Sequence, residues 1–115
     1  MEIKNKEKIL EILDNAYGYN PFNGCCLMFA EALQMKYGGE IYVVYSKKFA
    51  EHAVLLLDGK LHDFAYSLEP ESFIKRLNED WSEGYKIIGY RKFEEEDLRD
   101  MKRDKELSSE IVKYI

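Results

Sequence analysis

Hydrophobic residues recur at helical spacing in three stretches of the chain. The first stretch is Lys4–Ala16, the second is Cys26–Tyr37, which precedes Gly38-Gly39, and the third begins at Pro70. An apolar residue every three or four positions predicts an amphipathic helix. A glycine pair commonly ends such a helix, and a proline is favoured at its first position. We therefore expect a helix in each of these stretches.

Four shorter runs have the alternating or continuous apolar pattern of β-strands. They span residues 40–46, 53–57, 60–64 and 85–93. The second and third runs are separated only by Asp58-Gly59, a pair suited to the tight turn that needs positive φ at both central residues. The sequence thus predicts a hairpin within an antiparallel sheet.

The hairpin determines which polar side chains share a face. With a two-residue turn, Leu55 lies opposite His62 and Val54 lies opposite Asp63. Because side chains alternate along a strand, His52 falls on the same face as Val54 and Asp63. The ring of His62 points to the other face. His52 and Asp63 are then diagonal neighbours within reach of each other.

The C-terminal part of the chain has a different pattern. Residues 94–105 are a dense run of charges with few apolar positions, which predicts a solvated helix. Four apolar side chains follow at positions suited to dock the end of the chain on the domain or on a partner: Leu107, Ile111, Val112 and Ile115.

Two adjacent cysteines stand where the second predicted helix begins. Cys25 and Cys26 follow Asn23-Gly24, an expected cap and a tight entry. Unpaired amides and the helix dipole at a first turn favour an anion, so a thiolate forms there more readily. A thiolate, a histidine base and a carboxylate that orients the base form the trio that thiol catalysis needs.

The order of these features resembles the papain-like cysteine peptidase superfamily, particularly its small bacterial and phage members. These include NlpC-like peptidases and, more distantly, transglutaminase-like proteins. The matching positions are Cys26 in Gly-Cys-Cys-Leu-Met-Phe-Ala, His52 in His-Ala-Val-Leu and Asp63 in His-Asp-Phe, within residues 20–66. The resemblance favours Cys26 over its neighbour because Phe29, three residues later, matches the family's helix anchor.

The resemblance also suggests secondary positions in the site. The glutamine that the family carries ahead of its cysteine is absent, and Asn20 or Asn23 is expected to replace it as oxyanion donor. Trp81 matches an aromatic residue that walls the substrate cleft near the histidine, although the sequence favours a core position for this tryptophan.

What the resemblance implies for the whole chain is one α+β, papain-like domain over residues 1–115. N-terminal helices would pack on one side of an antiparallel sheet of about four strands, and residues 94–115 would form a charged helical tail. The implied activity is that of a cysteine peptidase-like hydrolase or acyl transferase. It would act on an amide, isopeptide or thioester bond of a peptide, peptidoglycan stem or protein, without a cofactor.

Composition and charge limit the partners and the cellular compartment that we expect. The chain has 115 residues and a net charge of −5, which argues against nucleic acid as a partner. It has no apolar run of transmembrane length and no signal-peptide core, and two unpaired cysteines suit a reducing cytoplasm. Adjacent cysteines have the wrong spacing for zinc and would make a strained disulfide, so we expect no metal.

Two other interpretations remain open from the sequence. The first is a phage- or mobile-element-encoded binding or inhibitor protein on the same scaffold, with an unused site. Small size, acidity and the missing glutamine fit it, and the tail at residues 94–115 would present a surface to a host protein. The second is a structural subunit in which Cys26 is merely a buried apolar residue.

Overall fold

The structure is a computed structural model that describes residues 2–22, 24–81 and 85–115. Its helices are α1 (Lys6–Tyr17), α2 (Cys26–Tyr37), α3 (Pro70–Asp80) and α4 (Lys105–Ile111), with 3-10 helices η1 (Glu95–Arg99) and η2 (Val112–Tyr114). Its strands are β1 (Glu40–Tyr45), β2 (Ala50–Leu57), β3 (Lys60–His62), β4 (Ser67–Leu68) and β5 (Gly89–Lys92). The predicted α+β class is confirmed.

The five described strands form one antiparallel sheet in the order β4-β3-β2-β1-β5. The sequence analysis expected about four strands and missed β4. That strand pairs only two residues with β3, which is too short to leave a hydrophobic pattern. The strand expected over residues 85–93 is also shorter, since only Gly89–Lys92 pairs with β1.

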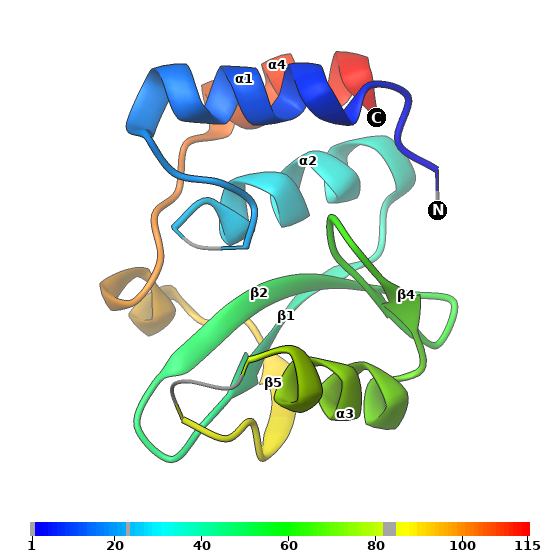
Figure 1. Cartoon of the computed structure of the whole chain (residues 1–115), viewed down its shortest axis with the longest axis vertical. Coiled ribbons are helices and arrows are strands. Elements are labelled where there is room, and N and C mark those ends of the chain that lie inside the picture. The colour runs from blue at the N-terminus through cyan, green and yellow to red at the C-terminus, as the bar shows by residue number, and fades with distance from the viewer. Residues whose placement is uncertain (1, 23, 82–84) are drawn as a thin grey trace.

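Helices cover both faces of the sheet, as Figure 1 shows, with α2 above it and α3 below it. Leu55 of β2 packs in a cluster with Phe29 of α2, whereas the next residue back, Val54, packs with Phe73 of α3. The expectation of helices on one side is therefore wrong. A continuous apolar run such as the one in β2 is typical of a strand that is buried on both faces.

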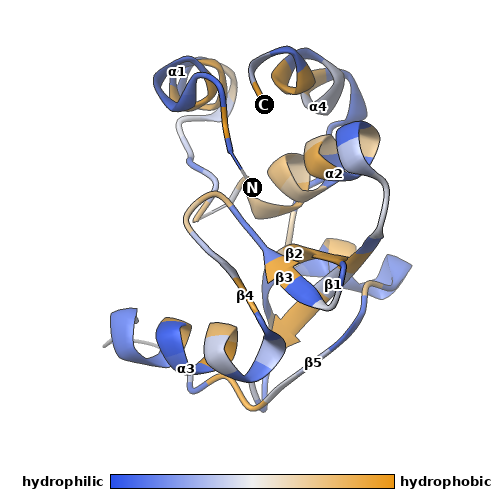
Figure 2. Cartoon of the chain, turned by 90° about the vertical axis from the view of Figure 1, so that its right-hand side faces the viewer, coloured by the Kyte–Doolittle hydropathy of each residue, from blue (hydrophilic) through white to orange (hydrophobic). Residues whose placement is uncertain are grey.

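The outer layer consists of α1 and α4, which lie across α2 from the sheet (Figure 2). Their apolar side chains, including Ile9 and Ile111, join one buried cluster with α2. Helix α2 is consequently surrounded, and its residues 26–33 are all buried. A helix that is apolar on all sides requires such an interior position.

The hairpin has the predicted register. Leu55 pairs with His62, and the turn residues Asp58 and Gly59 both have positive φ, at 53° and 75°. The strand β3 ends at His62, earlier than expected, because the chain turns at Asp63. The Asp63 backbone N–H donates to the carbonyl oxygen of Tyr66 at 2.9 Å.

The prediction of one helix over residues 94–105 is wrong. Glu94 and Asp97 form a reciprocal capping box that starts the short helix η1, and α4 begins only at Lys105. The side chain of Asp97 is 5% exposed and is held by Arg91 through two bonds of 2.7 and 2.9 Å. The charges in this run therefore make specific contacts. Residues 94–104, which we call the strap, lead across the domain from β5 to α4.

The end of the chain docks on the domain. Ile111 and Ile115 are fully buried in the cluster between α1 and α2. The Lys36 ammonium of α2 also donates to the backbone carbonyl oxygen of Ile115. Of the two outcomes that the sequence left open for these apolar residues, docking on the domain itself is confirmed. None of the helices in the described part of the chain is both long and apolar enough to cross a membrane.

Candidate active site

His52 of the central strand β2 and Asp63, which directly follows β3, lie together. Nε2 of His52 is 2.9 Å from Oδ2 of Asp63, the approach that the predicted hairpin register required. The two side chains are 1% and 4% exposed. The other oxygen, Oδ1, accepts the backbone N–H groups of Ala65 and Tyr66 at 2.8 and 2.7 Å. The turn that ends β3 therefore fixes the carboxylate so that one oxygen faces the imidazole.

The second histidine occupies the opposite face of the hairpin. Nδ1 of His62 is 2.7 Å from the hydroxyl of Ser67, and Nε2 is 3.1 Å from the carbonyl oxygen of Leu57. Both ring nitrogens are thus occupied in tying β3 to its neighbours. His62 is a structural residue, and the predicted separation of the two histidines is confirmed.

Cys26 is the first residue of α2 and packs against Ala50 and Ala53, on either side of His52 in β2. Cys25, at the N-cap position that we expected Asn23 to fill, is fully buried toward α1. The preceding Gly24 has a φ of 96°. A side chain there would need a rare backbone conformation, so glycine permits the sharp entry that places the thiol against the strand.

The environment of Cys26 favours its thiolate. Burial by itself raises the pKa of this thiol, but hydrogen bonding to the His52 ring and the charge of that ring outweigh burial and lower the pKa below its ordinary value. The backbone N–H groups of Ala53 and Leu27 act in the same direction. The helix start and the histidine strand therefore cooperate to hold a negative charge on sulfur.

The environment of His52 favours its charged form. Burial by itself lowers the pKa of the ring, but the Asp63 carboxylate and the Cys26 thiolate raise it to about 9. Both shifts favour a thiolate on Cys26 paired with an imidazolium ion on His52. The Nε2–H of that imidazolium donates to Asp63.

The remaining ring nitrogen of His52, Nδ1, is buried and makes no regular hydrogen bond to any residue that the structure describes. Cys26 and His52 each shift the pKa of the other, so the two side chains lie close enough to interact. Nδ1 is the atom that is left to exchange a proton with Cys26.

The neighbouring thiol behaves in the opposite way. Burial, followed by the charge of Cys26, raises the pKa of Cys25 to about 11. Two cysteines that are adjacent in sequence therefore differ sharply in chemistry, and Cys26 is the reactive candidate.

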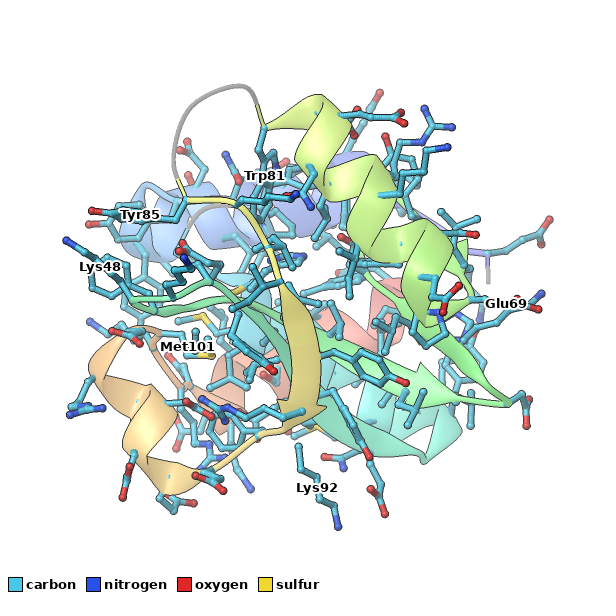
Figure 3. All side chains as sticks on the ribbon, turned by 90° about the horizontal axis from the view of Figure 1, so that it is seen from below. Lys48, Glu69, Trp81, Tyr85, Lys92 and Met101 are labelled. Carbon is cyan, nitrogen blue, oxygen red and sulfur yellow. The ribbon has the colours of Figure 1, made fainter. Side chains whose placement is uncertain are left out.

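Trp81 caps the end of α3 and stands edge-on to His52, with ring centroids 5.7 Å apart at 80°. Figure 3 shows Trp81 at the end of this helix. The half-buried indole also packs against the cluster beneath α3. Trp81 therefore has both the contact with His52 and a place at the core.

Of the two asparagines expected to donate to an oxyanion, the structure describes Asn20. Oδ1 of Asn20 accepts the backbone N–H of Phe22 at 2.9 Å, and its carbonyl oxygen accepts the N–H of Cys25 at 3.1 Å. Asn20 thereby shapes the loop that leads to the thiol. Asn23 lies outside the described residues. The oxyanion role of either residue stays a prediction.

A groove of about 270 Å³ opens beside Cys26. Its walls come from three separate parts of the chain: Phe22 and Gly24, then Phe49, Ala50 and Glu51, and finally Asp100 and Met101. Figure 3 shows Met101 between η1 and the sheet. Trp81, which the resemblance predicted as a wall of the substrate cleft, does not line this groove. Residues 100 and 101 carried no signal because they stand in a charged run far from Cys26 in sequence.

No group of three metal-binding side chains occurs among the described residues. Models of known protein families, curated proteins and solved structures gave no match to this chain.

Proposed function

We propose that the protein is a papain-like thiol hydrolase or acyl transferase that uses Cys26, His52 and Asp63. The observation that carries the proposal is the arrangement around His52. One ring nitrogen is bound to a fixed carboxylate at 2.9 Å, and the other is buried without a regular partner beside a helix-start thiol. A purely structural histidine has both nitrogens occupied, as His62 does.

The reaction would begin with the Cys26 thiolate. Sulfur attacks a carbonyl carbon and forms a tetrahedral intermediate with a negative oxygen. The imidazolium of His52 then gives its Nδ1 proton to the leaving nitrogen or sulfur, the bond to the leaving group breaks, and an acyl thioester remains on Cys26. Asp63 keeps the ring oriented and stabilises its charged form.

The second half of the reaction releases the acyl group. Neutral His52 takes a proton from water or from an acceptor amine, which attacks the thioester carbonyl, and the thiolate of Cys26 is restored. Water gives hydrolysis, and an amine gives acyl transfer. Peptides, isopeptide-linked proteins, peptidoglycan stems and thioesters all provide a suitable carbonyl.

The start of α2 would stabilise the oxyanion. The backbone N–H of Cys26 belongs to the first turn, where amide groups have no carbonyl partner within the helix. Asn20 is the described side chain expected to assist it, since it lies in the loop that directly precedes the thiol.

The test is acylation of the intact protein by a small thioester, followed by mass spectrometry. We expect a single acyl adduct on Cys26 that hydroxylamine removes. Cys25→Ser is the matched control, because serine is a good N-cap residue and should leave the adduct unchanged. A folded protein that forms no adduct, or forms it on Cys25, would refute the proposal and favour a binding or inhibitor protein on this scaffold.

A further inference from the structure

The groove beside Cys26 has a one-sided charge. Two carboxylates, Glu51 and Asp100, line it together with the apolar side chains of Phe22, Phe49 and Met101. No lysine or arginine is among the lining residues that the structure describes. An acidic, partly apolar groove attracts a cation on an apolar stem.

The neighbouring cations are directed elsewhere. The ammonium group of Lys48, next to Phe49 in sequence, lies 5.2 Å from the centre of the Tyr85 ring. Figure 3 shows Lys48 and Tyr85 together at the periphery of the molecule. The ammonium group of Lys102 lies 4.6 Å from the centre of the Tyr17 ring. Arg99, directly before Asp100, donates from Nε to the backbone carbonyl oxygen of Glu96 at 3.2 Å. None of these three cations forms an ion pair with Glu51 or Asp100 in the described part of the chain.

Both carboxylates are held in place by neutral donors. Oε2 of Glu51 accepts the hydroxyl of Ser46 at 2.6 Å, and Oδ2 of Asp100 accepts the backbone N–H of Ala50 at 3.1 Å. Neither carboxylate forms an ion pair with another residue in the described part of the chain. Each is positioned by the protein and keeps its charge for a ligand.

The strap that carries Asp100 and Met101 is fixed at both ends. Asp97 is bound by Arg91 of β5, and Arg103 donates to the buried Glu31 of α2 at 3.1 Å. Glu31 is 3% exposed, and it lies on the helix that begins with Cys26. These two anchors give the groove wall a defined position relative to the thiol.

From this arrangement we infer that the groove selects substrates with a basic side chain next to the carbonyl that Cys26 attacks. The inference rests on the proposed function and adds a substrate class to it. A volume of about 270 Å³ lies below the ~300–1,000 Å³ of pockets that bury drug-sized ligands, so it suits a single side chain. The apolar walls would contact the stem of a lysine or arginine, while Glu51 and Asp100 would face its charge.

The first experiment measures the charge of the groove at the thiol. Three methanethiosulfonates differ in the group they deliver: methyl is neutral, aminoethyl is cationic and sulfonatoethyl is anionic. The ratio of the cationic to the anionic rate at Cys26, in a Cys25→Ser background, reports the local potential. We expect Asp100→Asn and Glu51→Gln each to lower that ratio by about three- to tenfold, with the neutral rate unchanged.

Glu96→Gln is the matched control, because it removes the same charge from an exposed position on η1 that does not line the groove. It should leave the ratio nearly unchanged. An unchanged ratio in both groove variants, or an equal fall in the control, would overturn the inference.

The second experiment uses thioesters of N-acetyl-lysine, N-acetyl-norleucine and N-acetyl-glutamate. We expect acylation of Cys26 to be fastest with lysine, and the preference for lysine over norleucine to disappear in Asp100→Asn. Equal rates for the three thioesters would contradict the inference and leave the proposed function standing. Failure of all three to acylate a folded protein would instead refute the proposed function, and the methanethiosulfonate ratio would still decide the charge of the groove.

Discussion

Nε2 of His52 lies 2.9 Å from Oδ2 of Asp63, between two side chains that are almost completely buried. A buried imidazole facing a carboxylate is held charged, which is why burial fails to lower its pKa. The same contact leaves Nδ1 as the ring nitrogen without a hydrogen-bond partner among the described residues. The chemistry proposed for the thiol depends on this pair.

The pair predicts the effect of Asp63→Asn. The backbone N–H groups of Ala65 and Tyr66 would retain the amide oxygen, so the amide NH₂ would face His52. Nε2 would then have to accept a hydrogen bond instead of donating one, and the imidazolium would be lost. We expect the alkylation rate of Cys26 at pH 7 to fall about tenfold or more. The circular dichroism spectrum should be unchanged, because the fold is retained. An unchanged rate would show that the carboxylate does not support the site.

The two histidines should respond differently to the same substitution. We expect His52→Gln to reduce iodoacetamide labelling of Cys26 at pH 7 by about ten- to a hundredfold, since the thiolate loses its imidazolium partner. His62→Gln should leave labelling unchanged and lower the melting temperature, because it disturbs the bonds to Ser67 and Leu57. Equal losses of labelling in both variants would contradict the assignment.

The two cysteines should also separate under limiting reagent. At pH 6 we expect the carbamidomethyl group on Cys26, located by peptide mass spectrometry. Cys25 should stay unmodified, because its pKa is raised to about 11 and its side chain is fully buried. Label found mainly on Cys25 in the native protein would contradict this account of the helix start.

The hairpin shows how much of the site the sequence could predict. Asp58-Gly59 fixed the turn, the turn fixed the register, and strand alternation then selected His52 and Asp63 over the other histidine. Each step used residues that are close in sequence. The helix start at Cys26 was equally local, because glycines and apolar spacing mark where α2 begins and ends.

The strap shows where such reasoning fails. Residues 94–105 looked solvated because charges dominate them, yet Asp97 is buried by its pairing with Arg91, and Arg103 reaches Glu31, 72 positions earlier in the chain. Long-range ion pairs leave no periodic trace in a sequence. For the same reason, the analysis could not place Asp100 and Met101 beside Cys26.

The docked C-terminus leads to a prediction about stability. Ile111 is fully buried between α1 and α2, so Ile111→Ala should cost about 2–4 kcal/mol of unfolding free energy. The neighbouring exposed residue provides the control, and Glu110→Ala should change stability by less than about 0.5 kcal/mol. Urea denaturation measures both. A negligible effect of Ile111→Ala would mean that the tail does not dock in solution and is available to a partner.

The central claim is that His52 holds Cys26 as a thiolate, and the most direct test is the pH dependence of Cys26 alkylation. A lowered pKa means that the thiolate is already present below the ordinary thiol value of 9.0, and acid removes it only as the pH falls through the lowered value. We therefore predict a rate that levels off below pH 9 and changes again at about pH 9, where His52 loses its proton. A single rise at pH 9 or above, identical in the native protein and in His52→Gln, would contradict the account.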